Sequence, residues 1–265
     1  MLNKKKNPLI HMITNTVTIN DLAQVALCYG GRPIMAINHE EMEEIISVSN
    51  GLLINIGTLE PYTIESMKLA LECALKRKVP RVIDPVGVQA SKIRRNLIND
   101  FIDNYKPHLI KGNLAEIKIL IGEEINSTGV DSYENNISKS LKEKIMNYSK
   151  EKNTIIIATG KTDFITDGQR SVFINNGVSM MGDITGTGCM LGALVTIALS
   201  FYKDYNKSFE EVVKVVTAWG ICGEKAKESL KDGEGLMTFK TKLLDNISLI
   251  TDEEINKKGK IIYEC

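Results

Sequence analysis

The stretch GDITGTGCM, residues 182–190, places glycines, threonines and a cysteine directly before a long apolar run. Gly186 and Gly188 can adopt positive φ and let a ligand approach the backbone closely. The chain then enters a helix at about Gly188 and Cys189, where unpaired N–H groups and the helix dipole favour negative charge. The pattern predicts a phosphate site, with a tight turn and packing glycines as the alternative. It lacks the lysine of a P-loop.

Cys189 is the nucleophilic side chain of this stretch. The dipole of the first helical turn can lower the pKa of a thiol, which would make Cys189 a nucleophile or a weak base. The sequence assigns no histidine partner to it, because the three histidines of the chain are scattered. Covalent thiol catalysis is therefore the less favoured interpretation.

Four other polar residues stand where predicted strands end or helices begin. Asp84 ends a buried strand in VIDPVG and is either a turn former or a carboxylate beside a metal. Asn113 and Glu116 have the spacing of a helix cap, in which Glu116 reaches back to the backbone. In the alternative, Glu116 lies near a phosphate-bound Mg²⁺, which takes oxygen ligands and retains waters. Thr159 follows the strand TIIIA and forms either a plain turn or a nucleotide contact.

The elements that must position these residues alternate between two patterns. Short apolar stretches predict strands at 8–14, 33–37, 52–57, 81–87, 108–113 and 154–160. Amphipathic stretches between them predict helices at 18–29, 39–48, 61–78, 91–103 and 114–121. This alternation predicts a largely parallel sheet that is covered on both faces. Since ligands bind beyond the carboxyl ends of parallel strands, we expect the polar residues at those ends to share one site.

The second half of the chain follows a different pattern. Residues 163–168 and 170–177 predict an antiparallel hairpin that turns at Asp167 and Gly168. A polar, lysine-rich helix is predicted at 132–152, and helical structure from the glycine-rich stretch to about residue 247. There is no internal repeat and no low-complexity linker, so we expect residues 1–265 to form a single domain.

Composition disfavours several classes of protein. The 265 residues carry a formal net charge of zero, whereas nucleic-acid-binding domains normally have a basic excess. The apolar runs are too short for a membrane span, and the N-terminus does not read as a signal peptide. Five cysteines without paired spacing argue against a disulfide framework or a zinc site. We expect a cytoplasmic protein with free thiols, without nucleic-acid or membrane partners.

Taken together, several stretches closely resemble the hydroxyethylthiazole kinase family, which has the ribokinase-like fold. They are PLIHMITNTVTIND (8–21), GRPIMA (31–36), LLINIGTL (52–59), DPVG (84–87), KGNLAEI (111–117), ATGKTDFITDG (158–168), ITGTGCMLGA (184–193) and GEGLMTFKTKLLD (233–245). The resemblance implies a single α/β/α domain with a mostly parallel central sheet. It also implies ATP-dependent phosphorylation of the primary alcohol of 4-methyl-5-(2-hydroxyethyl)thiazole in thiamin salvage.

The resemblance assigns roles residue by residue. The substrate-binding residues that it implies are Met35, Gly186, Asn15 and Asn20. The ATP-binding residues that it implies are Lys111, Thr159, Asn113 and Gly188. Asp84 and Glu116 match acids placed near the Mg²⁺–phosphate region. In catalysis, the backbone of Gly186 and Gly188 faces the γ-phosphoryl group. Cys189 stands where most ribokinase-like kinases carry an aspartate base, and we interpret it as a positioning residue and weak base.

The resemblance further implies a homotrimer, in which the N-terminal segment completes a site whose phosphate side belongs to the neighbouring subunit. Two residues depart from the family pattern. Lys111 stands where an ATP-contacting arginine is usual and therefore lacks the planar fork of a guanidinium. Asp183 replaces a residue that is often basic, and it would weaken nucleotide binding unless it points away from the phosphate.

Three other functions fit parts of the same pattern. A hydroxymethylpyrimidine kinase of the same superfamily would share the anion site but differ in the N-terminal pocket residues. An ATP- or ADP-dependent NAD(P)H-hydrate dehydratase, a lyase, would need an aspartate where Cys189 stands. A non-catalytic nucleotide or thiazole sensor would not need the acids at positions 84 and 116.

Overall fold

The computed structural model describes residues 7–123, 137–201 and 205–264. Its centre is a nine-stranded sheet in the order β2-β1-β3-β4-β5-β6-β7-β8-β9. The first six strands run parallel to one another, which confirms the predicted mostly parallel sheet. These strands are β1 (Leu9–Ile13), β2 (Arg32–Ile34), β3 (Gly51–Asn55), β4 (Arg81–Asp84), β5 (Leu109–Asn113) and β6 (Ile155–Thr159).

Three antiparallel strands complete the sheet. The predicted hairpin is present as β7 (Asp163–Thr166) and β8 (Ser171–Ile174), and Gly168 in its turn has φ +83°. An edge strand, β9 (Ile261–Glu264), pairs with β8 and was not predicted. Its side chains are half-buried or exposed, so its sequence carries no periodic burial signal from which it could be recognised.

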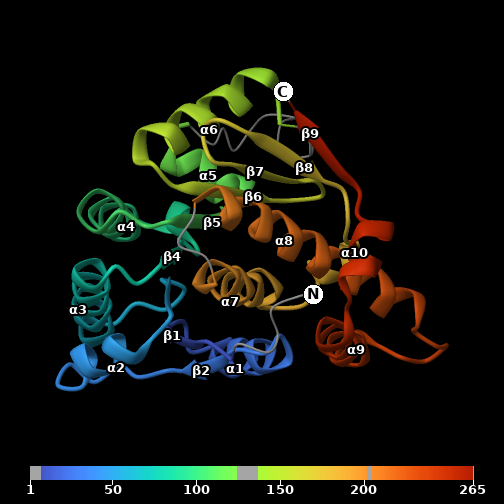
Figure 1. Ribbon diagram of the computed structural model, residues 1–265, viewed down its shortest axis with the longest axis horizontal. Helices are drawn as coiled ribbons and strands as arrows, with labels where there is room; N and C mark the ends of the chain where they lie inside the picture. Colours follow the sequence, from blue (N-terminus) through green and yellow to red (C-terminus); the bar gives the residue numbers. More distant parts are fainter. Residues whose placement is uncertain (1–6, 124–136, 202–204, 265) are drawn as a thin grey trace.

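Helices cover both faces of the sheet (Figure 1). One face carries α2 (Met42–Val48), α3 (Pro61–Arg77), α4 (Lys92–Tyr105), α5 (Leu114–Leu120) and α6 (Lys139–Lys152). The other carries α1 (Ile19–Cys28), α7 (Thr187–Ser200), α8 (Tyr205–Glu228), α9 (Leu236–Leu249) and α10 (Asp252–Lys258). Neighbouring residues of one strand enter opposite apolar clusters, as Leu52 and Leu53 do. This arrangement confirms the predicted α/β/α fold.

The predicted boundaries need small corrections. The strand predicted at 81–87 ends at Asp84, because Pro85 and Gly87, with φ +69°, turn the chain into a 3₁₀ turn. The helix predicted at 132–152 begins at Lys139, where Ser138 accepts the capping hydrogen bond. Residues 132–136 of that prediction lie outside the described part of the chain. No helix in that part is long and apolar enough to cross a membrane.

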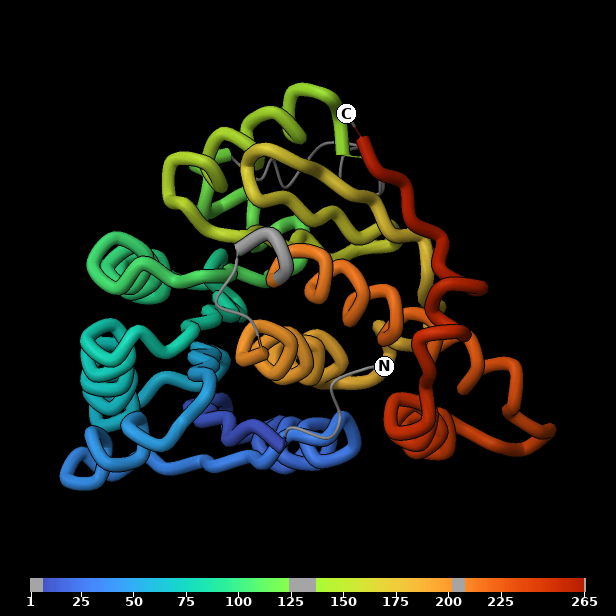
Figure 2. Tube along the Cα trace, viewed as in Figure 1, coloured from blue at the N-terminus to red at the C-terminus, as the bar shows by residue number. Residues whose placement is uncertain are grey.

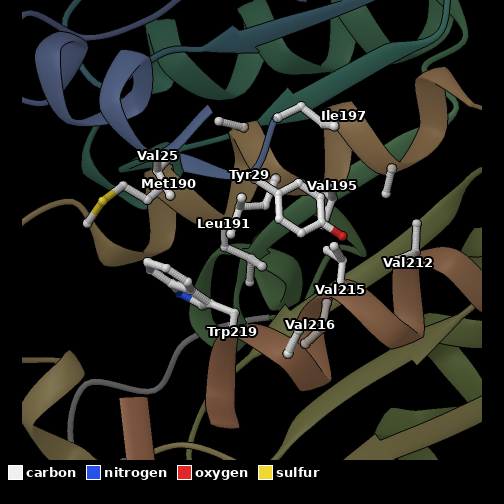
Figure 3. Packing of buried hydrophobic residues seen from close by; sticks show 14 of the residues in the cluster. Val25, Tyr29, Met190, Leu191, Val195, Ile197, Val212, Val215, Val216 and Trp219 are labelled. Atoms are coloured by element: carbon white, nitrogen blue, oxygen red, sulfur yellow. The ribbon is translucent and has the colours of Figure 1, made fainter. Parts of the chain in front are cut away.

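Helix α7 is apolar on nearly all sides because it is buried on nearly all sides. It runs through the middle of the molecule, between α1 and α8 (Figure 2), and packs against β3 and β4. Leu191 and Val195 of α7 lie next to Val215 and Trp219 of α8 (Figure 3). The interior of the fold therefore fixes where the N-terminus of α7 lies relative to the carboxyl ends of the strands.

Candidate active site

The carboxyl ends of the parallel strands and the N-terminus of α7 meet at one edge of the sheet. Asn55 and Asp84 are register partners at the ends of β3 and β4. A Cβ atom at Gly192 in α7 would lie 3.5 Å from Asp84 Oδ2. Lys111 lies on the neighbouring strand β5, and Cys189 in the first turn of α7. The side chains of Asn55, Asp84 and Lys111, from three neighbouring strands, therefore lie close to one another and to Cys189.

Gly186 forms the entry to α7 as predicted. It is the N-cap residue of α7, with φ +94°, and no side chain caps the helix there. A Cβ atom at this position would lie 2.6 Å from Thr18 Cγ2, so the close approach to α1 also requires glycine. The first N–H groups of α7 are thus left without a side-chain partner, which is the arrangement of an anion-binding helix terminus.

Positive φ at Gly188 was a wrong expectation. The helix begins at Thr187, one residue earlier than predicted, and Gly188 has helical geometry within its first turn. Its missing side chain serves a different purpose, because a Cβ atom there would lie 3.3 Å from Lys111 Nζ. Gly188 therefore leaves space beside a buried ammonium group.

The remaining polar residues of this turn differ in their surroundings. Thr187 Oγ1 donates to Met181 O at 2.8 Å and so fixes the preceding turn. Thr185 and Asp183 are exposed. Asp183 is also not among the residues that line the adjoining cavity.

A buried ion pair connects Lys111 with Asp84. Lys111 Nζ lies 3.2 Å from both carboxylate oxygens, and the two side chains are 4% and 0% exposed. Burial raises the pKa of Asp84 to about 6 despite the ammonium group beside it. Burial lowers the pKa of Lys111, but the negative charge of Asp84 and the hydrogen bonds to its carboxylate raise it, and the net direction is upward. Both groups are therefore charged at neutral pH.

Asn55 joins the site residues to one another. It is one of the polar residues at the predicted strand ends, but no role in the site was predicted for it. Its Nδ2 donates to Asp84 Oδ2 at 2.9 Å and to Cys189 Sγ at 3.2 Å. Its Oδ1 accepts from Asn15 Nδ2 at 3.0 Å and from Gly57 N at 2.9 Å. The available signal was an amide at the end of the fully apolar strand LLIN, where a polar side chain needs buried partners.

Cys189 is buried next to these groups. Burial and the nearby Asp84 carboxylate raise the pKa of its thiol, opposite to the lowering that a helix dipole alone predicts. Asn55 and, at 3.6 Å, Asn15 donate to its sulfur. The thiol is therefore neutral at pH 7, which fits a positioning role better than that of a nucleophile.

Of the predicted substrate-binding residues, Asn15 and Met35 are buried or half-buried, whereas Asn20 is exposed. Asn15 is buried and contacts Cys189 within the same chain. Met35 is half-buried and packs against the apolar cluster that contains α7. Asn20 is exposed on the first turn of α1, and among the described residues no hydrogen bond connects it to Asn15 or Cys189.

Glu116 forms the predicted helix cap. Asn113 and Glu116 make a complete capping box at the start of α5, in which Glu116 Oε2 accepts from Asn113 N at 2.8 Å. Glu116 Oε1 accepts from Gly87 N at 2.9 Å and thereby ties the DPVG turn to β5. Both oxygens are thus engaged by the backbone, although each has a second lone pair.

A cavity of about 610 Å³ opens beside the N-terminus of α7. Three residues predicted to bind ATP, Asn113, Thr159 and Gly188, line it. Its apolar lining includes Val178, Leu191 and Trp219. The combination of bare backbone amides, an adjacent ammonium group and an apolar wall is suited to a ligand that carries both phosphates and an aromatic ring.

Comparison with known proteins agrees with this geometry. Residues 2–253 match the hydroxyethylthiazole kinase family. The chain is 56% identical to a hydroxyethylthiazole kinase of Clostridium perfringens over 98% of both chains. It is 40% identical to that of Thermoanaerobacter pseudethanolicus over 98% of this chain and 97% of the relative.

Solved structures extend the comparison to the fold. The hydroxyethylthiazole kinase of Pyrococcus horikoshii superimposes with a TM-score of 0.85 at 32% identity, covering 100% of this chain and 97% of the other. A pyridoxal kinase of Staphylococcus aureus in complex with ADP shares the fold, with a TM-score of 0.60 at 16% identity over 85% and 90% of the two chains. The chain therefore belongs to the hydroxyethylthiazole kinase family, with the fold of the ribokinase-like superfamily.

Proposed function

We propose that this chain transfers the γ-phosphoryl group of MgATP to the primary alcohol of 4-methyl-5-(2-hydroxyethyl)thiazole, as a step of thiamin salvage. The observation that carries the proposal is the uncapped N-terminus of α7, which lies beside Lys111, Asp84 and Cys189 and borders the cavity. Family membership supports the choice of acceptor. Under this proposal the cavity takes the nucleotide, and the region around Cys189, Asn15 and Met35 takes the thiazole.

Phosphoryl transfer requires little covalent chemistry from the protein. Catalysis consists mainly of positioning the attacking and leaving oxygens and neutralising charge on the transferred group. The amides of residues 186–189 face the moving phosphoryl group in our proposal, because no side chain caps the start of α7. Lys111 lies next to Gly188 and offsets negative charge on the nucleotide. The acceptor hydroxyl lies near Cys189 and attacks in line. In a loose transition state its proton can leave late, so no strong base is needed.

The proposed metal ion is Mg²⁺, held near Asp84 and Glu116. When bound, Mg²⁺ neutralises charge on the phosphates. The oxygens of both carboxylates already accept hydrogen bonds. Within the described residues, no group of three or more His, Cys, Asp or Glu side chains is arranged to hold a metal ion. Mg²⁺ held here would therefore take most of its ligands from phosphate oxygens and waters, as it commonly does, with the two carboxylates contributing directly or through waters.

Replacing Cys189 by serine should leave substantial kinase activity, with kcat within roughly tenfold of the wild type. A raised thiol pKa leaves little thiolate at pH 7, and a serine hydroxyl can keep the hydrogen bond from Asn55. Steady-state kinetics between pH 6 and pH 9 check this. A loss of several hundredfold, or an acceleration that follows titration of the thiol in the wild type, would show that Cys189 acts as the base.

The assembly that we propose is a homotrimer located in the cytoplasm, with residues of the N-terminal segment near a subunit interface. Val17, just before α1, and Met237 in α9 are 68% and 71% exposed, and these two helices pack against each other. Large contiguous apolar patches mark interaction surfaces, whereas single exposed apolar side chains do not, so these two residues only indicate where such a contact is proposed. Light scattering should give three times the 29.4 kDa mass of one chain. A monomeric mass would contradict the proposal.

One assay separates the proposed function from its rivals. Purified protein is incubated with MgATP and a panel of thiazole and pyrimidine alcohols, and phosphorylated products are followed by mass spectrometry. We expect phosphate on the thiazole alcohol. Phosphorylation of the pyrimidine alcohol alone would identify a pyrimidine kinase, and nucleotide binding without any product would identify a sensor. In a parallel incubation with ATP and hydrated NADH, conversion of the hydrate to NADH would identify the dehydratase.

A further inference from the structure

One wall of the cavity is formed by residues 176–181, which cross α8 at two glycines. Asn176, Gly177 and Met181 of this segment line the cavity. A Cβ atom at Gly220 would lie 2.6 Å from Asn176 O, and one at Gly223 would overlap the Met181 side chain. The backbone of the wall therefore lies directly on the surface of α8.

Glu224 holds this wall in place by polar contacts. It lies one helical turn after Gly220, on the same face of α8. Its Oε1 accepts from Gly177 N at 3.0 Å, from Asn176 Nδ2 at 3.3 Å and from Lys260 Nζ at 3.0 Å. The Glu224 side chain is only 17% exposed, so these donors replace most of the water around its carboxylate.

The C-terminal segment is joined to the same wall. Asn176 Nδ2 donates to Lys258 O at 3.0 Å, and Asn176 Oδ1 accepts from Lys260 N at 2.7 Å. Asn175 N donates to Lys260 O at 3.0 Å. The segment that contains α10 and β9 runs beside α8 (Figure 2). Asn176 is thus held between Glu224 on one side and the C-terminal segment on the other.

We propose that Glu224 is a positioning residue of the nucleotide cavity, which ties the wall 176–181 to α8 and to the C-terminal segment and thereby sets the affinity for the nucleotide. The inference rests on the proposed function in one respect, namely that this cavity takes the nucleotide. Glu224 itself does not line the cavity and acts through Asn176 and Gly177. Its effect should therefore appear in nucleotide binding and not in the chemical step.

Two substitutions disturb the wall 176–181 by different means. Glu224→Ala removes the acceptor of the Gly177 N–H, and Gly220→Ala pushes the backbone at Asn176 without any change of charge. We expect each to raise the KM for ATP roughly tenfold, while kcat and the KM for the thiazole alcohol change by less than about twofold. Glu224→Gln keeps an acceptor oxygen and should recover most of the affinity.

Nucleotide binding can be measured without turnover. Trp219 lines the cavity next to Gly220 and is the single tryptophan of the chain, so its fluorescence in an ADP titration gives a dissociation constant. Glu254→Gln is the matched control. It removes the carboxylate of α10 that binds Lys225, the neighbour of Glu224 in α8. Glu254 makes no contact with Asn176 or Gly177 in the described structure. This control should bind ADP like the wild type.

The possible failures are distinguishable. A wild type that phosphorylates the thiazole alcohol and binds ADP, with Glu224→Ala and Gly220→Ala equal to it, overturns only the positioning role. A lower melting temperature with equal losses for both substrates overturns it as well, because it indicates general destabilisation. A wild type whose cavity binds neither ADP nor ATP overturns the nucleotide assignment, and the role of Glu224 with it.

Discussion

Gly186→Val should reduce kcat by roughly a hundredfold or more while the protein stays folded. Valine disfavours the φ of +94° that Gly186 adopts, and its Cβ would lie 2.6 Å from Thr18 Cγ2. The turn must therefore shift, and the N–H groups at the start of α7 move away from the phosphoryl group. Single-turnover kinetics with saturating MgATP, combined with a thermal melt, measure the two effects separately.

Gly122→Ala is the matched control for backbone strain. Gly122 also has a positive φ, +78°, but a Cβ atom there would meet no heavy atom within 4 Å. Alanine at this position should lower the melting temperature slightly and leave kcat unchanged. Near-normal turnover of folded Gly186→Val would refute the proposal that the backbone at this turn holds the phosphoryl group.

Lys111→Met should destabilise the protein by about 3–5 kcal/mol and abolish most activity, because it leaves a buried carboxylate without its counter-charge. Burial already raises the pKa of Asp84 to about 6, and loss of the ammonium group raises it further. A raised pKa in the folded state means that the free energy of unfolding of the variant is greatest when Asp84 is protonated. It falls as the pH rises through this raised pKa. Urea unfolding should therefore show a smaller loss at pH 5 than at pH 8.

Two further variants separate charge from position at this site. Lys111→Arg keeps the positive charge, and we expect it to lose less stability than Lys111→Met, although the larger guanidinium group must fit a buried space. Lys68→Met breaks an exposed ion pair with Asp100, and it should hardly move the urea midpoint. A Lys111→Met protein with the stability of the wild type at pH 8 would contradict the assignment of a charged buried pair.

Sequence patterns determined the architecture because they report local geometry. The alternation of apolar strands and amphipathic helices was sufficient for the parallel part of the sheet, and the turn residues Asp167 and Gly168 were sufficient for the hairpin. The capping box at Asn113 and Glu116 is equally local, since its two residues are three positions apart. The edge strand β9 was not predicted, because half-buried and exposed side chains at the edge of a sheet give no periodic pattern of apolar residues.

The contacts within the candidate site were decided by the tertiary structure. Asp84 and Cys189 lie 29 and 134 residues after Asn55 in the sequence, yet the Asn55 side chain donates hydrogen bonds to both. The direction in which the pKa of Cys189 shifts depends on burial and on Asp84, neither of which a helix N-terminus reveals by itself. The role of Gly188 in α7 likewise depends on Lys111, which lies on β5. Sequence alone thus located the residues at the ends of the right elements, whereas their partners and charges required packing, because both depend on contacts between distant parts of the chain.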